Sequence, residues 1–280
     1  MSELCQRVIV ENYELIGITE TCVTESVNDA ELSIDGYSMF RKDRGTRGGG
    51  LILYIKNTIR ARVNKELTSS KFAESLWCNV EIDHQRLLVG LCYIRPTSTV
   101  ENDEELLSVM EKAVLQTTAH HVLMMGDFNF PEIDYASDNA AGSDTAPPAL
   151  FLAKTQELCL FQHVTDVTRI RQNQTPSKLD YVFTDEENLI DVVNYEVPLG
   201  KSDHVVLTWN LLLATPPLSS KQVKYNYHKG DYQGIRNSLQ MIQWKHRWEG
   251  KTVNEMWMDL RKVLIEVVDI YVLLKKRKEN

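Results

Sequence analysis

The chain has 280 residues, of which 43% are hydrophobic and 25% are charged. These fractions are typical of a soluble globular protein with a large core. No apolar stretch approaches the roughly 20 residues that a membrane-spanning helix needs, so we expect no contact with a membrane. The formal net charge is −8 at pH 7, which argues against a simple nucleic-acid coat protein. Together these values favour an acidic globular protein.

The N-terminal residues and the cysteines indicate in which part of the cell the protein is expected. Residues 1–5 lack the basic segment and apolar run of a secretory signal. Five scattered cysteines without a CxxC motif are typical of reduced thiols, not of a disulfide frame or a zinc site. We therefore expect the nucleus or the cytoplasm. The basic run Lys275–Lys278 is most often a solvated terminus, but such runs also serve as nuclear localisation signals.

The first 100 residues read mainly as strands. Residues 2–11 show the spacing of a short amphipathic helix, with Leu4 and Val8 four positions apart. Apolar runs bounded by polar or glycine-rich turns then predict a series of strands. Short polar connections favour antiparallel neighbours among them. The predicted strands cover residues 13–19, 36–40, 51–56, 59–63, 74–82 and 86–94.

Helices and strands alternate further along the chain. We expect helices at 101–118, where Ser98 or Thr99 can form the cap, and from 146 to about 160. Further strands are predicted at 122–125, 164–169, 181–184, 190–197 and 204–213. We place a domain at 1–213, a Pro- and Ser-rich linker at 214–220 and a helical tail at 221–280, with helices at 231–243 and 252–274. Many strands before a few helices predict an α+β layered sandwich with a helical C-terminal tail.

Acidic side chains follow several of the predicted strands. Glu20 ends the first, Asp127 and Asn129 follow the strand at 122–125, and Asp180 and the pair Asp203-His204 flank later ones. A lone acid at a strand end is usually just the first solvated residue, and Asp127 with Asn129 could form an ordinary Asx turn. Carboxylates that converge on one edge of a sheet can instead hold a divalent metal ion against a phosphate.

Further residues fit the same chemistry. If the backbone stays extended, Asp127 and Asn129 project the same way and can orient a water and touch a phosphate oxygen. A histidine held by a carboxylate, as Asp180 could hold His204, is a good donor to a phosphate. Tyr93 closes a strand and is by default a core tyrosine, although its phenol could also donate. The loop from Arg41 to Arg47 is most often a solvated hairpin, but its cations, among them Arg44, could contact DNA phosphates.

The ordered set of motifs resembles the endonuclease/exonuclease/phosphatase superfamily. The segments that carry the resemblance are Ile18–Thr21, Gly48–Gly50, Tyr93–Pro96, Gly126–Asn129, Leu179–Tyr181 and Ser202–His204. Within the superfamily, the chain is most similar to the apurinic-type endonuclease domain of LINE-like non-LTR retrotransposons. Thr168-Arg169 and the tryptophan-bearing tail also resemble that branch.

The resemblance implies a fold and a set of roles. The fold would be a four-layered α/β sandwich, two mixed sheets face to face with helices outside. Glu20 would bind Mg²⁺, or Mn²⁺ in its place, with help from Asp203, and Asp127 would orient or deprotonate the attacking water. Asn129 and Tyr93 would contact the scissile phosphate, with Arg44 and Arg47 on the DNA, and His204, held by Asp180, would stabilise the phosphorane. The product would be a DNA nick with a 3′-hydroxyl, and the tail would lead toward a reverse transcriptase.

Two departures from the family pattern keep other functions open. Superfamily members usually begin with a central strand that carries an Asn, whereas this chain starts at the helix that leads into the Glu20 strand, so we expect a truncated domain. The chain also ends without a polymerase-like Asp-Asp motif. The leading hypothesis is a Mg²⁺-dependent DNA endonuclease whose activity the truncation could impair. The alternatives are a phosphatase acting on a small phosphoester and a catalytically dead interaction domain.

Overall fold

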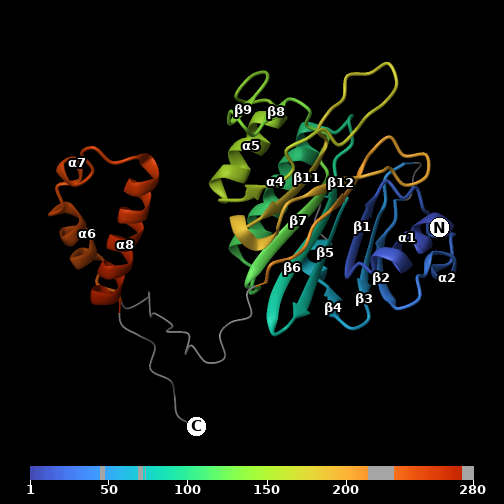
Figure 1. The fold of residues 1–280 in the computed structure, drawn as a ribbon, viewed down its shortest axis with the longest axis horizontal. Helices are drawn as coiled ribbons and strands as arrows, with labels where there is room; N and C mark the ends of the chain where they lie inside the picture. The colour runs from blue at the N-terminus through green and yellow to red at the C-terminus, as the bar shows by residue number, and fades with distance from the viewer. Residues whose placement is uncertain (45–47, 69–71, 73, 214–229, 273–280) are drawn as a thin grey trace, which may run out of the picture. The chain divides into compact units, whose positions relative to one another are not determined.

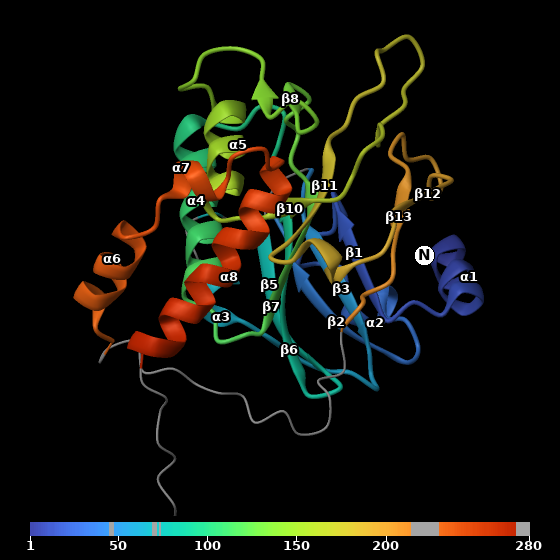
Figure 2. The same ribbon diagram turned by 60° about the vertical axis from the view of Figure 1, so that its left-hand side comes forward.

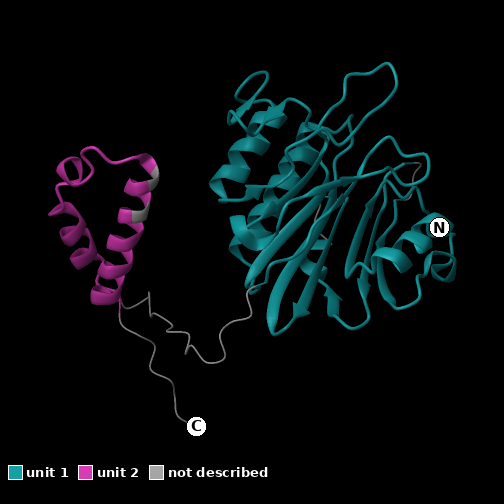
Figure 3. Cartoon of the chain, in the orientation of Figure 1, with its two compact units in different colours: residues 1–215 teal, residues 216–280 magenta. Residues whose placement is uncertain are grey.

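The computed structural model describes residues 1–44, 48–68, 72, 74–213 and 230–272. The chain divides into two compact units, Met1–Thr215 and Pro216–Asn280, which are coloured separately in Figure 3. The linker expected at 214–220 and the basic run at 275–278 lie outside the described residues. Each unit is therefore considered by itself.

A three-stranded antiparallel sheet forms one half of the first unit. Its order is β1 (Leu15–Thr19), β3 (Leu51–Lys56) and β2 (Tyr37–Lys42). Helices α1 (Ser2–Glu11) and α2 (Asp29–Leu32) cover its outer face, where Leu4 and Val8 pack with Ile52 and Tyr54. The predicted helix at 2–11 and its apolar pair are thus confirmed. The side chains of β3 are almost wholly buried because β3 is paired on both sides.

A six-stranded mixed sheet forms the other half. Its strands run in the order β10-β11-β7-β6-β5-β4, with β6 and β7 parallel and all other neighbours antiparallel. The strands are β4 (Arg60–Val63), β5 (Ser75–Ile82), β6 (Gln85–Tyr93), β7 (His121–Asp127), β10 (Phe161–Gln162) and β11 (Asp180–Thr184). Helices α4 (Val100–Leu115) and α5 (Pro147–Glu157) pack on its outer face. In Figure 1 these two helices lie on one side of the pair of sheets and α1 and α2 on the other.

The two sheets pack face to face over a shared apolar core. Alternate residues of β3 enter it from one sheet, and alternate residues of β5, β6 and β7 enter it from the other. The buried members include Leu51, Leu53, Ile55, Leu76, Val89, Leu91 and Leu123. The order of layers is helices, sheet, sheet, helices, which confirms the predicted α+β sandwich (Figure 2).

The last strands of the unit are shorter than predicted. The expected strand at 190–197 is reduced to β12 (Asn194–Glu196), and that at 204–213 to β13 (Val206–Thr208), with which it pairs. The expected strand at 164–169 is wrong, because only isolated pairing of Arg169 occurs there. The hydroxyl of Tyr195 accepts hydrogen bonds from the backbone N–H groups of Thr165 and Asp166. The Tyr195 side chain therefore binds backbone N–H groups that would otherwise pair with a neighbouring strand.

Four small elements of this unit follow no clear apolar pattern. They are α3 (Lys65–Thr68), β8 (Ile133–Asp134), β9 (Asn139–Ala140) and the 3₁₀ turn at Glu187–Leu189.

The second unit contains the helices α6 (Tyr232–Gln240), α7 (Trp244–Arg247) and α8 (Val253–Tyr271). Thr252 caps α8 and shares a capping box with Glu255. The rings of Trp244 and Trp248 lie 4.7 Å apart, centroid to centroid. None of the helices in the described ranges has the length and apolar character required to cross a bilayer.

Gly126 is required for the close approach of β6 and β7. Its φ of +147° is rarely adopted by residues with a side chain, and a Cβ at this position would lie 1.8 Å from the carbonyl oxygen of Cys92. The atom in the way belongs to the backbone of β6, so it cannot move aside as a flexible side chain could. The residue just before Asp127 therefore has to be glycine.

We predict that Gly126→Ala lowers the free energy of unfolding by about 3 kcal/mol or more, since overpacking alone costs about 1–3 kcal/mol and the backbone conformation adds to it. Gly36→Ala is the matched control, because Gly36 also has a positive φ but no atom lies within 4 Å of its added Cβ. Urea denaturation of both variants measures the difference. Equal losses for the two would contradict the steric explanation.

Candidate active site

Three polar side chains start from the same end of three neighbouring strands. Asp127 is the last residue of β7, Tyr93 is the last residue of β6, and Asp180 is the first residue of antiparallel β11. The register pairs Asp127 with Tyr93 on one side and with Asp180 on the other. Strand pairing alone therefore brings these residues to one edge of the six-stranded sheet.

His204 joins this group from the loop before β13. Its backbone bridges to Arg169, and its Nδ1 lies 2.8 Å from Oδ2 of Asp180. Potential ligand atoms of Asp127, Asp180 and His204 all lie within 4.8 Å of one another. The expected pairing of His204 with Asp180 is thus present in the structure. We call Asp127, Asp180 and His204 the acidic cluster.

Negative charge in the acidic cluster is disfavoured by burial and by neighbouring carboxylates. Burial, together with the nearby carboxylates of Asp180 and Glu20, raises the pKa of Asp127 to about 8, although His204 opposes this. Burial lowers the pKa of His204, but its hydrogen bond to Asp180 and the surrounding carboxylates outweigh burial and raise this pKa overall. Both shifts indicate a site that attracts positive charge, either a proton or a cation.

Glu20 approaches the cluster from the opposite sheet. It follows β1 with a left-handed φ of 51°, and the hydroxyl of Tyr93 donates a hydrogen bond to its Oε1. Burial and this hydrogen bond raise the pKa of Tyr93, so the phenol stays protonated. Glu20 and Tyr93 thereby join the rims of the two sheets. Glu20 lies beside the acidic cluster but is not one of its three tightly grouped members.

Asn129 has a different conformation from the one expected. Its φ of 50° is left-handed, so the backbone through residues 127–129 is not extended, which was the condition for the two side chains to project the same way. The backbone N–H of Asn129 donates to Oδ1 of Asp127 at 3.2 Å, which is the Asx turn considered as an alternative. Its side-chain amide donates to the carbonyl of Ile94 at 2.8 Å. The turn fixes the position of the Asp127 carboxylate, so an Asx turn at this point is compatible with a functional role of Asp127.

Asp203 lies near the acidic cluster but is held by another partner. Its Oδ2 accepts a hydrogen bond from Nε of Arg169 at 2.9 Å, and this cation keeps the pKa of Asp203 below its usual value despite partial burial. Asp203 is therefore bound to Arg169 and is not one of the three members of the acidic cluster. It still lines the same hollow as Glu20.

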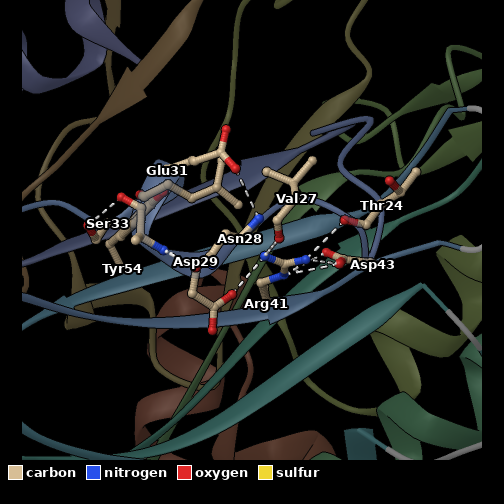
Figure 4. A network of polar contacts seen from close by, with 11 residues as sticks. Thr24, Val27, Asn28, Asp29, Glu31, Ser33, Arg41, Asp43 and Tyr54 are labelled. Atoms are coloured by element: carbon tan, nitrogen blue, oxygen red, sulfur yellow. Dashed lines mark hydrogen bonds and ion pairs between the residues drawn. The ribbon is translucent and has the colours of Figure 1, made fainter.

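The described part of the basic segment, Arg41 to Arg44, differs from a solvated loop. Arg41 lies within β2 and donates to the carbonyls of Val27 and Thr24 and to the carboxylates of Asp29 and Asp43, as Figure 4 shows. The ammonium group of Lys42 donates to the carbonyl oxygens of Thr68 and Ser75. These two cations serve the fold and are not available to contact DNA.

Of the two arginines expected to contact DNA, the structure describes Arg44 but not Arg47. Nε of Arg44 lies 3.8 Å from the carboxylate of Glu74, whose pKa is raised by burial. Arg47 lies outside the described residues.

Sequence reasoning gave no role to two residues that position the site. The buried hydroxyl of Thr168 accepts hydrogen bonds from the backbone N–H groups of Leu179 and Asp180, both at 3.0 Å. Arg169 holds Asp203, as described above. The Thr168-Arg169 pair was visible as a motif, but its contacts join segments that are far apart in the sequence.

A hollow of about 520 Å³ opens beside the acidic cluster. Glu20, Asp127, Asp180, Asp203 and His204 all line it, together with apolar residues from both sheets. Carboxylates that line such a hollow can bind a hard cation and a phosphate group.

Comparisons with known proteins match a segment of the sequence and the fold. Residues 87–208 match a family model described as endonuclease-reverse transcriptase. No curated protein sequence matches the chain at a significant level.

Solved structures share the fold at low sequence identity. The endonuclease domain of TRAS1, a telomere-specific non-LTR retrotransposon, is 17% identical with a TM-score of 0.59, covering 76% of this chain and 92% of that one. An AP endonuclease from Archaeoglobus fulgidus is 12% identical with a TM-score of 0.54, covering 75% and 93%. An endonuclease/exonuclease/phosphatase family protein from Leptotrichia buccalis is 13% identical with a TM-score of 0.51, covering 75% and 91%. The chain thus shares the fold of these structures, and its segment 87–208 is similar to the family described as endonuclease-reverse transcriptase.

Proposed function

We propose that the protein is a Mg²⁺-dependent DNA endonuclease that hydrolyses one phosphodiester bond and leaves a 3′-hydroxyl. The observation that carries this proposal is the acidic cluster, with Glu20 beside it, at the end of an open hollow. The family description, endonuclease-reverse transcriptase, supports the same activity. The TRAS1 and Archaeoglobus structures that share the fold are both described as endonucleases.

The donor set suits a hard divalent cation. Carboxylate oxygens are the ligands that Mg²⁺ prefers, and Mn²⁺ accepts the same oxygens together with a histidine nitrogen. We propose Glu20 and Asp203 as ligands, each through a carboxylate oxygen beside the one already hydrogen-bonded by Tyr93 or Arg169. The raised pKa of Asp127 reflects its burial and, after that, the neighbouring carboxylates, whose charge a cation would compensate. When bound, the ion supplies charge stabilisation to the scissile phosphate.

Side chains of the protein activate the water, bind the phosphate and orient one another. Asp127, fixed by the backbone N–H of Asn129, orients the attacking water and accepts its proton. His204 has Nδ1 committed to Asp180, so Nε2 is left to donate to a non-bridging phosphate oxygen as negative charge develops. Asn129 contacts the same phosphate through the amide proton that it does not donate to Ile94, and the phenol of Tyr93 donates to this phosphate by turning its single O–H away from Glu20. Asp180 acts through His204, which it orients and keeps charged.

DNA is the proposed substrate, with Arg44 and Arg47 on its phosphates. We further propose that residues 221–280 lead toward the reverse transcriptase of a parent element, for which the 3′-hydroxyl would serve as a primer.

A phosphatase acting on a small phosphoester is the second candidate, because the fold also carries that activity. The Neisseria enzyme NExo, described as a 3′ phosphatase bound to a product DNA hairpin, shares the fold with a TM-score of 0.55 and 11% identity. A catalytically dead interaction domain is the third. Release of phosphate without plasmid nicking would favour the second, and neither activity would favour the third.

We predict that the protein nicks supercoiled plasmid with Mg²⁺, that EDTA abolishes nicking, and that Asp127→Asn lowers its rate by about a hundredfold or more, the size expected for loss of a general base. Asp144→Asn is the matched control, since Asp144 is an exposed loop carboxylate. Gel electrophoresis measures nicking, and direct extension of the nick by a DNA polymerase tests for the 3′-hydroxyl. Equal loss in both variants would contradict the role of Asp127.

We expect His204→Ala to lower the single-turnover rate by about a hundredfold or more, because a donor that acts on developing charge is lost. Exposed His84 is the control position, and His84→Ala should keep the parental rate. A fully active His204→Ala protein would refute the assignment, provided that its unfolding temperature is unchanged.

A third prediction concerns stability without metal. A carboxylate whose folded pKa is raised favours the folded state below its unfolded pKa of about 4, and this contribution is lost as the pH rises toward 8. In EDTA, Asp127→Asn should therefore raise the unfolding temperature at pH 8 and change it little at pH 4. Mg²⁺ should stabilise the parent protein more than the variant. Scanning calorimetry measures both effects, and an Asn variant less stable at pH 8 would contradict the charge argument.

A further inference from the structure

The row of polar residues at the edge of the six-stranded sheet has a further member, Glu74. The pairing of β5 with β6 sets Ser75 opposite Cys92, and the N–H of Tyr93 donates to the carbonyl of Glu74 at 2.9 Å. Glu74 therefore stands opposite Tyr93, as Tyr93 stands opposite Asp127 (the strands are labelled in Figure 1). Opposed residues of neighbouring strands share a face of the sheet. With strands about 4.8 Å apart, the backbones of Glu74 and Asp127 lie roughly 10 Å apart along the row.

Glu74 is a buried acid that interacts with two arginines. Its side chain is 12% exposed, and neither carboxylate oxygen makes a hydrogen bond of ordinary geometry within the described residues. Burial raises the pKa of Glu74, whereas the cations of Arg44 and Arg95 and the N–H of Gly50 lower it. Arg44 follows β2 of the smaller sheet, and Arg95 follows β6 of the larger one. The Glu74 carboxylate therefore attracts one guanidinium group from each sheet.

Arg95 is fixed at this edge by its neighbours in the chain. The N–H of Ile94 continues the pairing with β7 by donating to the carbonyl of Asp127 at 2.9 Å, and the carbonyl of Ile94 accepts the side-chain amide of Asn129 at 2.8 Å. Pro96 disfavours a helical backbone at Arg95, so the chain stays extended there. Alternate residues of an extended chain share a face, which puts Arg95 on the face that carries the row. Arg95 also directly follows the carbonyl group that holds Asn129.

The guanidinium groups of Arg44 and Arg95 are not committed to the fold. Both residues are partly buried, yet neither guanidinium donates a hydrogen bond that the described residues accept, and Nε of Arg44 is 3.8 Å from Glu74. Arg41 is the opposite case, since carbonyls and carboxylates accept its donors (Figure 4). An arginine has five N–H donors, and burying them without acceptors costs free energy. Such donors fit an acceptor that a ligand supplies.

We propose that Arg44 and Arg95, oriented by Glu74, bind a second phosphate group of the DNA strand, beside the scissile one. Planar guanidinium groups match phosphate oxygens in pairs, which a single ammonium group cannot do. This inference rests on the proposed function, because it assigns the scissile phosphate to the acidic cluster. It adds Arg95 to the substrate-binding residues and makes Glu74 a positioning residue.

Binding of a labelled duplex of about 20 base pairs tests the contact without cleavage. Fluorescence anisotropy is measured in EDTA over a series of salt concentrations. We expect Arg95→Ala and Arg44→Ala each to weaken binding by about tenfold, the loss of a charge-assisted hydrogen bond, and to reduce the salt slope by about 0.9. Arg62→Ala is the matched control, since Arg62 is exposed on β4 opposite Asn79, away from the row. Unchanged affinity and slope in Arg95→Ala would overturn the proposal.

Glu74→Gln separates positioning from plain charge. A carboxylate repels a nearby phosphate, so removal of its charge alone would strengthen binding. We expect weaker binding instead, by about threefold to fivefold, the size of a partly screened ion pair. The effect should vanish in a protein that already carries Arg44→Ala and Arg95→Ala. Stronger binding by Glu74→Gln would refute the positioning role. If this variant does not fold, Arg95→Lys decides, because it should keep the salt slope and still bind more weakly.

Nicking kinetics with Mg²⁺ show which phosphate Arg95 contacts. Arg95→Ala should raise KM for plasmid about tenfold and keep kcat within about twofold, because a second phosphate is bound equally in the ground state and the transition state. A fall in kcat with unchanged KM would assign Arg95 to the scissile phosphate and contradict the proposal. If the parent protein binds the duplex through Arg95 but does not nick plasmid, the proposed function fails alone. If it nicks plasmid but binds DNA independently of Arg95, this inference fails alone.

Discussion

The site depends on one constraint, the register of three strands at one edge of the six-stranded sheet. Parallel pairing of β6 with β7 and antiparallel pairing of β7 with β11 bring Tyr93, Asp127 and Asp180 into line. Gly126 allows the close approach of β6, and the Asx turn at Asn129 fixes the Asp127 carboxylate. A shift by one residue would send these side chains to the opposite face. The same hydrogen bonds that build the core therefore align the polar groups.

Electrostatics at this edge work against the stability of the metal-free protein. Asp127 is buried beside Asp180, and its pKa is raised to about 8 because its charged form is poorly solvated and repelled. Strain of this kind is typical of functional sites, where the compensating charge comes from a ligand. Thr168 holds the backbone at Asp180 in place, and Arg169 holds the carboxylate of Asp203. The surrounding fold holds in place a cluster that would otherwise separate.

The two sheets contribute differently. The six-stranded sheet supplies the aligned groups and is covered by helices on its outer face, whereas the smaller sheet supplies Glu20 from an edge strand. The hydrogen bond from Tyr93 to Glu20 joins the two rims. Opposite β1, the edge of β13 is also open within the described part of the chain, and the hollow between them reaches the acidic cluster. The hollow between the edges of β1 and β13 is therefore continuous with the acidic cluster.

The sequence by itself determined the layered α+β architecture, the helix at 2–11 and most strands of both sheets, because apolar periodicity is a local signal. It also named Asp180 as a candidate partner of His204, but only the structure brought the two side chains together. Only the tertiary structure decided that Asn129 is left-handed, that Arg41 and Lys42 hold the fold together, and that Asp203 is bound to Arg169. The tertiary structure also decided that 164–169 is not a strand, since backbone N–H groups of this segment donate to the hydroxyl of Tyr195. These outcomes depend on contacts between segments far apart in the chain, which no local pattern records.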